Sequence, residues 1–247
     1  MANYFTFAGE RSTDYGLSIE RYPNIPFPAR KVEQRSVLGR NGSYISDHGG
    51  YENVPISYPC YFKGAPDQAD QIAAWLYAHE AEYFRLEDTY HPGVYRRAIC
   101  LGPAEIQNIR NRFGRLTIDF SALPEQWLLD GERPVVAEAT GVARVFGVDL
   151  FNPTRFAAQP LIRLEGDGPC SLTIGKTVIT VAKVAGYMDI DCASGEAYRG
   201  NDSCNAQVEI STIGWPVLDS GENSVVCAGT GAQTIKRMTI WPRWWTL

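Results

Sequence analysis

The sequence contains few of the residues on which most enzymes depend. Of its 247 residues only three are histidines, His48, His79 and His91, and none has the spacing of a metal-binding pair. There is no G-x-S-x-G nucleophile elbow, no G-x-x-x-x-G-K phosphate loop and no glycine fingerprint of a dinucleotide-binding fold. We therefore assign no catalytic, cofactor-binding or metal-ligating residue, and we expect a protein that is not an enzyme.

Cysteine and long apolar runs are also scarce. The six cysteines include no C-x-x-C pair, and six in 247 residues is far below the density of a disulfide-stapled fold. The N-terminal stretch MANYFTFAGERSTDYG lacks the basic and apolar regions of a secretory signal, so we expect reduced thiols in a protein made in a cytosol. No apolar run approaches the ~20 residues that cross a bilayer, and we expect no membrane insertion.

Basic residues are outnumbered by acidic ones. The chain has 23 Lys and Arg against 28 Asp and Glu, a formal net charge of −5. A dedicated nucleic-acid-binding protein needs a basic face to displace phosphate counterions, and a polybasic membrane-surface protein needs one too, so the charge argues against both. The remaining composition, 45% hydrophobic and 12% aromatic, is that of a globular protein. The length suits one large or two small domains, whose hydrophobic core is large enough to fold without disulfides or bound metals.

The first part of the chain, residues 1–134, predicts an α+β domain with one helix. We expect that helix over about residues 67–81, with Pro66 and Asp67 at its start, where proline is tolerated and a carboxylate is favourable. The period-two alternation over 116–121 predicts a half-buried strand. The side chains at helical spacing i, i+3, i+4 and i+7 are Ile72, Trp75, Leu76 and His79.

Residues 38–60 have a different pattern, LGRNGSYISDHGGYENVPISYPC. Asn41-Gly42 favours the left-handed backbone of a tight turn, and a second turn signal, Gly49-Gly50, follows. Aromatic and β-branched residues lie between and after these turns. The stretch therefore predicts an extended hairpin or arm that projects from the body of the first domain.

The second part, residues 135–247, predicts an antiparallel β-sandwich. The turn signals of Leu129–Pro134 indicate a boundary before it, and no helical period follows Val135. Seven or more short strands separated by turns every 8–12 residues are typical of a β-sandwich. The expected strands include residues 162–164, 172–174, 178–181, 188–190, 208–210, 224–227 and 235–241.

The pair Asp189-x-Asp191 is the one carboxylate pattern that suggests a cation site. In a strand, residues i and i+2 share a face. We therefore expect both carboxylates to face water, opposite the apolar Met188 and Ile190, and interpret them as a solvated face.

Four tryptophans gather late in the chain. Exposed aromatic side chains stack on pyranose rings in sugar-binding proteins, so a lectin is one interpretation. Burial within the body or at a domain interface is the other, and we favour it because large aromatics dominate burial. The residues are Trp215, Trp241, Trp244 and Trp245.

The order of short motifs is more informative than any one of them. In chain order they are residues 5–9 (FTFAG), 14–17 (DYGL), 37–42 (VLGRNG), 51–54 (YENV), 118–124 (IDFSALP), 151–154 (FNPT), 160–162 (PLI), 190–191 (ID), 214–218 (GWPVL), 220–223 (SGEN) and 242–245 (PRWW). In this order, over nearly the full chain, the sequence resembles the distal tail protein (Dit) family of siphophages, a component of the tail tip or baseplate hub. The cysteine content departs from that resemblance.

The resemblance implies a structural protein of the virion that is made in the host cytoplasm. Such proteins form a homohexameric ring at the distal end of the tail tube, built by N-terminal domains, with C-terminal galectin-like β-sandwich domains outside it. One face of the ring meets the tail tube protein and the other meets the tail hub or tail-associated lysin. Receptor-binding proteins are further partners, and DNA passes through the channel.

By analogy, an arm over residues 38–58 reaches a neighbouring subunit. Two other functions are compared with this one. A carbohydrate-binding adhesin would use residues 136–247 to recognise host cell-wall sugars. A cell-wall hydrolase would need paired carboxylates or a metal constellation, which cannot be assembled from this sequence. The predicted subunit-interface residues are Gly39, Arg40, Asn41, Gly42, Tyr44 and Tyr51.

Overall fold

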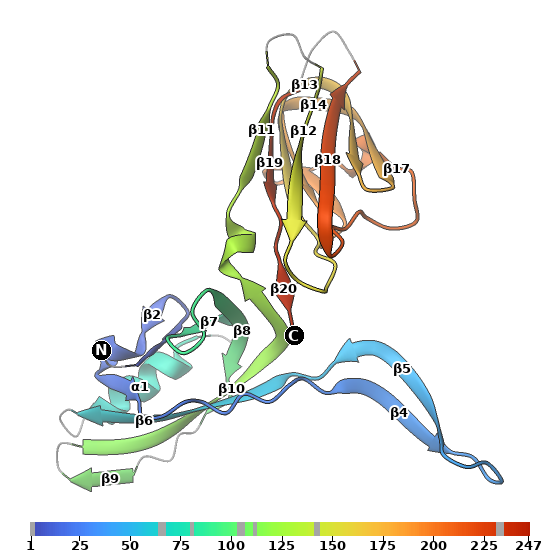
Figure 1. Ribbon diagram of the computed structural model, residues 1–247. Coiled ribbons are helices and arrows are strands. Elements are labelled where there is room, and N and C mark those ends of the chain that lie inside the picture. Colours follow the sequence, from blue (N-terminus) through green and yellow to red (C-terminus); the bar gives the residue numbers. More distant parts are fainter. Residues whose placement is uncertain are drawn as a thin grey trace. The chain divides into compact units, whose positions relative to one another are not determined.

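The computed structural model describes residues 3–63, 68–79, 82–102, 107–110, 113–140, 144–230 and 235–247. The chain divides into two compact units, residues 1–126 with Leu247 and residues 127–246 (Figure 1). Each unit has its own cluster of buried hydrophobic side chains. We call them the N-terminal unit and the C-terminal unit. The turn predicted as a boundary forms a short 3₁₀-helix over Leu129–Glu132.

The N-terminal unit is a curled sheet that carries the one α-helix of the described residues, α1 (Gln68–Tyr77). The strand order is β2-β1-β7-β8-β10-β6-β3, and β9 also pairs with β10. The longest pairing joins β6 and β10 in antiparallel register, from Phe113 opposite Lys63 to Ala122 opposite Val54. The strands are β1 (Phe5–Phe7), β2 (Glu10–Arg11), β3 (Leu17–Ile19), β6 (Val54–Lys63), β7 (Phe84–Asp88), β8 (Val94–Cys100), β9 (Gln107–Arg110) and β10 (Phe113–Leu128).

Alternation along the strands explains why this sheet has one buried face. Every second residue of β10 from Gly114 to Pro124 is buried, which confirms the strand predicted over 116–121. The helix covers that face with Ile72, Trp75 and Leu76. It ends at Tyr77, so His79 lies beyond it, and the predicted start at Pro66 and Asp67 falls outside the described residues.

The C-terminal unit is an antiparallel sheet of short and long strands, and no α-helix is present among its described residues. Every strand segment predicted for it lies within an observed strand. The strands of this sheet are β11 (Val135–Glu138), β12 (Val145–Asn152), β13 (Leu161–Ile174), β14 (Thr177–Asp191), β15 (Glu196–Arg199), β16 (Asp202–Ser203), β17 (Val208–Ile210), β18 (Gly221–Gly229) and β19 (Ile235–Trp241). The last strand, β20 (Trp245–Thr246), pairs with β10 instead.

The two long strands β13 and β14 change partners halfway along their length. The first part of β13 pairs with β19 and the second part with β18, while β14 pairs first with β17 and then with β15. The change coincides with Gly166, Gly168 and Gly186, which all have positive φ, and with register shifts after Glu165 and Gly168. Glycine bulges bend strands in this way, so the two halves of the sheet enclose one common core.

Each unit contains a buried thiol that makes its stability fall at alkaline pH. Burial raises the pKa of Cys60 in the N-terminal unit and of Cys192 in the C-terminal unit to about 12, from a usual value of 9.0. Below pH 9 both thiols are protonated in the folded and in the unfolded chain. Above it the unfolded chain releases the proton first, and the stability of each unit falls until pH passes 12.

We expect each thiol to remove up to about 4 kcal/mol from the free energy of unfolding of its unit between pH 9 and 12. Urea denaturation at a series of pH values measures this loss, with amide exchange to separate the units. The variant Cys60→Ala should lessen the pH dependence of the N-terminal unit, in which Tyr58 still has a raised pKa, and leave that of the C-terminal unit unchanged. An unchanged slope in both units would show that Cys60 is not responsible.

Candidate functional site

A two-stranded hairpin of the described chain is exposed along almost its whole length. It consists of β4 (Arg30–Ser36) and β5 (Ser43–Tyr51), which form a separate two-stranded sheet (Figure 1). The strands are antiparallel, from Arg30 opposite Tyr51 to Ser36 opposite Ser43. All of β4 and most of β5 are exposed to solvent. We call residues 30–51 the arm.

The arm differs in its limits from the arm predicted over 38–60. The prediction missed the strand Arg30–Ser36, whose sequence RKVEQRS has no apolar alternation. It also included residues 54–60, which belong to β6 and point every second side chain into the core, with Val54 and Ile56 fully buried. The alternation of VPISYPC is that of a core strand, so the end of the predicted arm was wrong.

The arm exposes apolar side chains that have no core to join. The exposed fractions are 104% for Leu38 at its tip and 54% and 58% for Tyr44 and Ile45. An isolated two-stranded hairpin is only marginally stable in water unless another element packs on it. Exposed apolar side chains on such a hairpin indicate a surface that another element covers.

The tip of the arm is a six-residue loop between Ser36 and Ser43. The Arg40 backbone N–H donates to the Val37 carbonyl at 3.2 Å, which closes a β-turn with Gly39 as its third residue. Gly39 has a φ of 80°, as a type II turn requires at this position. Gly42 also has a positive φ, but Asn41-Gly42 does not form the two-residue hairpin turn that the sequence favours.

The structure places all six predicted interface residues on the arm. The first four lie in its tip and are exposed. Tyr44 lies near the start of β5, opposite Arg35. Tyr51 lies at the root, half-buried, with the Arg30 guanidinium 5.3 Å from its ring centre. Their role in subunit contact stays a prediction. The first four are Gly39, Arg40, Asn41 and Gly42.

The arm and the rest of the chain carry opposite net charge. The arm contains four basic residues, Arg30, Lys31, Arg35 and Arg40, and two acidic ones, which gives +2. Subtracting this from the −5 of the whole chain leaves −7 for the remainder. Opposite potentials attract during encounter and favour one partner over others. Outside its arm, a second copy of this chain carries a net charge of the complementary sign.

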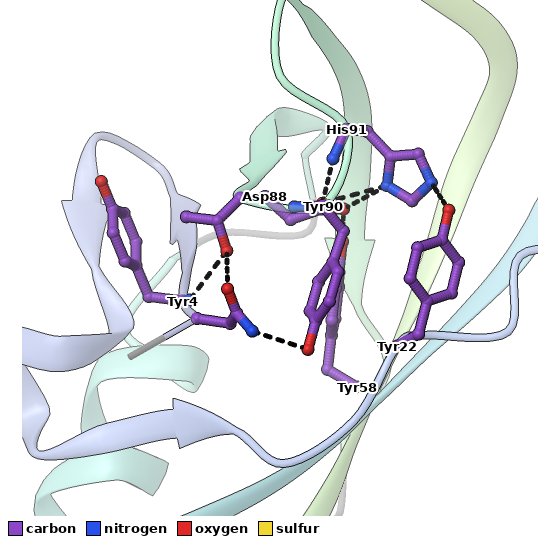
Figure 2. Close-up of polar contacts among 8 residues, drawn as sticks. Tyr4, Tyr22, Tyr58, Asp88, Tyr90 and His91 are labelled. Carbon is purple, nitrogen blue, oxygen red and sulfur yellow. Dashed lines mark hydrogen bonds and ion pairs between the residues drawn. The ribbon is translucent and has the colours of Figure 1, made fainter. Parts of the chain in front are cut away.

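A cluster of hydrogen bonds centred on Asp88, at the end of β7, contacts Tyr22 in the segment that precedes the arm (Figure 2). The Asp88 side chain is only 6% exposed. Its carboxylate accepts hydrogen bonds from the backbone N–H groups of Tyr90 and His91 at 2.8 and 2.9 Å. The Tyr58 hydroxyl donates to it at 2.8 Å. These donors fix Asp88 as an acceptor.

His91 joins this cluster to the segment that leads into the arm. Its Nδ1 lies 3.0 and 3.1 Å from the two carboxylate oxygens of Asp88, and its Nε2 lies 2.6 Å from the Tyr22 hydroxyl. A carboxylate only accepts, so Nδ1 carries a proton and donates a hydrogen bond to Asp88. Nε2 and the Tyr22 hydroxyl share the second hydrogen bond of the ring. Tyr22 also contacts the Tyr90 ring edge-to-face, 5.0 Å between centroids.

Burial shapes the electrostatics around Asp88. It raises the pKa of the Tyr58 hydroxyl well above its usual value, and the adjacent Asp88 carboxylate raises it further. Burial also lowers the pKa of Arg96, whose guanidinium donates to the Pro124 carbonyl at 3.4 Å. Tyr58 therefore stays a neutral hydrogen-bond donor, and the arrangement positions side chains without activating a nucleophile.

Sequence reasoning missed this cluster because its members are far apart in the chain. From the sequence we assigned His91 no partner, and the residue lies in the turn between β7 and β8. The spacing of Asp88 and His91, i and i+3, is a local signal that could have paired them. Tyr22 is 69 residues away from His91, and no local pattern reveals that contact.

The interpretation of Asp189 and Asp191 as a solvated pair was wrong. Arg163 lies opposite Asp189 in the sheet and binds its carboxylate through two hydrogen bonds of 2.7 and 2.8 Å, and Asp189 is 4% exposed. Arg243 binds Asp191 in the same way at 2.7 and 3.0 Å. Burial raises the pKa of Asp191, but Arg243 and backbone N–H donors outweigh it and lower the net value. Both carboxylates are structural.

The late tryptophans pack against the body of the C-terminal unit. Trp244 is in the core with 3% exposure. Trp245 stacks on Phe156 with 4.6 Å between ring centroids and donates its indole N–H to the Ala157 carbonyl. Trp215 and Trp241 are half-buried. These contacts favour the structural interpretation over an exposed sugar platform.

Within the described ranges, no three metal-ligating side chains lie together, and no helix has the length and hydropathy that crossing a bilayer requires. No protein-family model and no curated protein sequence matches the chain. Among solved structures, the chain is similar to the crystal structure of SPP1 Dit (gp 19.1), described as a paradigm of the hub adsorption apparatus in phages that infect Gram-positive bacteria. The TM-score is 0.67 at 12% identity, and the match covers 100% of both chains. Over its full length, the chain thus has the fold of a siphophage distal tail protein.

Proposed function

We propose that this chain is a structural virion protein that forms a homohexameric ring at the distal end of a phage tail. The observation that carries the proposal is the full-length fold match to SPP1 Dit, which includes both units rather than one common domain. Fold alone does not prove function. The arm adds independent support. It is an exposed β-hairpin, and none of its residues belongs to the buried cluster described for the N-terminal unit.

In this proposal residues 1–134 build the ring and residues 135–247 form a galectin-like domain outside it. A closed ring needs the same heterologous contact repeated between neighbouring subunits. An arm that reaches from one subunit to the next supplies such a contact, through its exposed apolar tip and its backbone hydrogen-bonding groups. The arm's charge of +2 against −7 for the remainder favours another copy as its partner.

The ring has two faces and a channel. One face binds the tail tube protein, and the other binds the tail hub or tail-associated lysin, with receptor-binding proteins further out. DNA crosses the channel in transit. The acidic character of the chain outside the arm supports this, because phosphates are repelled from a negative lumen rather than retained by it.

Immunogold labelling tests the location of the protein. Phage particles produced from the genome that encodes this chain are labelled with antibodies against it and viewed by electron microscopy. We expect gold at the distal end of the tails and none on the capsids. Labelling that is absent from tails while the protein is abundant in the lysate would contradict the proposal.

The alternative, a carbohydrate-binding adhesin, receives less support. Its predicted platform uses tryptophans that are buried or stacked within the C-terminal unit. Binding of the full chain to purified cell-wall polysaccharide, lost on Trp241→Ala, would favour this alternative over a purely structural role.

A further inference from the structure

We propose that Tyr22, His91 and Asp88 form a latch that fixes the direction in which the arm leaves the N-terminal unit. The proposal rests on the arm's proposed role in ring assembly, and it assigns His91 as a positioning residue of that arm. The contact that carries it is the 2.6 Å approach of the Tyr22 hydroxyl to Nε2 of His91.

The latch has a rigid side. His91 is held on Asp88 by both its backbone N–H and its Nδ1. Asp88 is nearly buried and is itself held by Tyr58 from β6. Nε2 of His91 is therefore a hydrogen-bonding atom at a fixed position on the body of the unit.

The other side is the segment that enters the arm. Glu20 donates its N–H to the Pro59 carbonyl at 2.8 Å, and Asn24 forms a β-bridge with Ser57. Between these two points lies Tyr22, which is 60% exposed and contributes nothing to the buried core. A tyrosine that is exposed yet held by a hydrogen bond and two ring contacts positions the backbone rather than filling space.

The segment between the latch and the arm is stiff. Residues 23–29 contain three prolines, Pro23, Pro26 and Pro28, and each fixes its own φ near −65°. A proline-rich stretch acts as a semi-rigid spacer. The orientation set at Tyr22 and at the bridge of Asn24 to Ser57 is therefore transmitted to Arg30, where the arm begins.

The returning strand is held as well. At the root, the Glu52 N–H donates to the Ala29 carbonyl at 2.7 Å. The Asn53 side-chain amide donates to the Tyr83 hydroxyl at 2.7 Å and to Ser121 Oγ at 3.0 Å. Both strands are thus fixed where they leave the body. Such a preorganised arm loses less conformational entropy when it meets a neighbouring subunit.

The test compares Tyr22→Phe, which removes only the latch hydroxyl, with the control Tyr61→Phe, which removes a hydroxyl from an exposed tyrosine of β6. Amide exchange of Glu52 in the dissociated chain measures the arm root. We expect exchange about three- to tenfold faster in Tyr22→Phe and unchanged in Tyr61→Phe. The chain concentration for half-assembly should rise by at least about threefold in Tyr22→Phe alone.

A second variant, His91→Phe, breaks the latch from the other side. The double variant with Tyr22→Phe should exchange no faster at Glu52 than His91→Phe does, because both remove the same contact. Unchanged Glu52 exchange in Tyr22→Phe would overturn the latch. Faster exchange with wild-type assembly would overturn its role in assembly. If the wild-type chain does not assemble at all, the ring proposal fails, and the exchange measurement still decides whether the latch exists.

Discussion

Removing the arm is expected to abolish self-assembly without unfolding the N-terminal unit. In this variant an Asn-Gly dipeptide replaces residues 31–50 and joins Arg30 to Tyr51, which already lie opposite each other. No arm residue belongs to either buried cluster, so the unit should unfold at the wild-type denaturant concentration. The concentration for half-assembly should rise at least about a hundredfold, since truncation removes a central contact.

A matched pair of point variants refines this test. Leu38→Asp places a charge on the arm tip, and Ile213→Asp places the same charge on an equally exposed apolar residue of the C-terminal unit. Only the first should weaken assembly, as measured by analytical ultracentrifugation over a concentration series. An armless chain that assembles at the wild-type concentration would show that the ring contact lies elsewhere.

Large core truncations should destabilise one unit at a time. Phe120 packs against Phe5, Phe7 and Tyr58 with ring centroids 5.0–5.9 Å apart, and Leu172 is fully buried in the other cluster. Phe120→Ala should cost the N-terminal unit about 3–5 kcal/mol, and Leu172→Ala should cost the C-terminal unit about 2–5 kcal/mol. The two clusters share no residue, so neither effect should spread to the other unit.

Native-state amide exchange measures the free energy of unfolding of each unit separately. A loss of 3 kcal/mol speeds the slowest exchange about a hundredfold, in β10 for the first variant and in β13 for the second. Val145→Ala, at an exposed position of β12, serves as the control and should change neither unit. Equal acceleration in both units by either core variant would show that the chain unfolds as a single cooperative body.

Local pattern was enough to predict the strand over 116–121, the seven strand segments of the C-terminal unit and the helix. The alternation around Leu116 and the spacing of Ile72, Trp75 and Leu76 each reflect one buried face, and burial of one face is what forms these elements. The helix was predicted too long because His79 continues the spacing but lies past the end at Tyr77. The fold class, mainly β with one helix, follows from the same patterns.

Contacts between distant residues could not be predicted from pattern. Asp189 alternates with apolar neighbours like a solvated residue, but sheet register places Arg163 opposite it and removes it from water. The Tyr22–His91 contact depends on where the chain crosses after 69 residues. The first strand of the arm was missed because alternation reports burial, and a strand exposed on both faces has none.

The mass of the purified chain in solution tests the central claim most directly. Native mass spectrometry and negative-stain microscopy over a range of concentrations should reveal a closed ring of six copies, six times the 27.4 kDa of one chain. A single-copy mass at every concentration, unchanged when the tail tube protein from the same genome is added, would contradict the account.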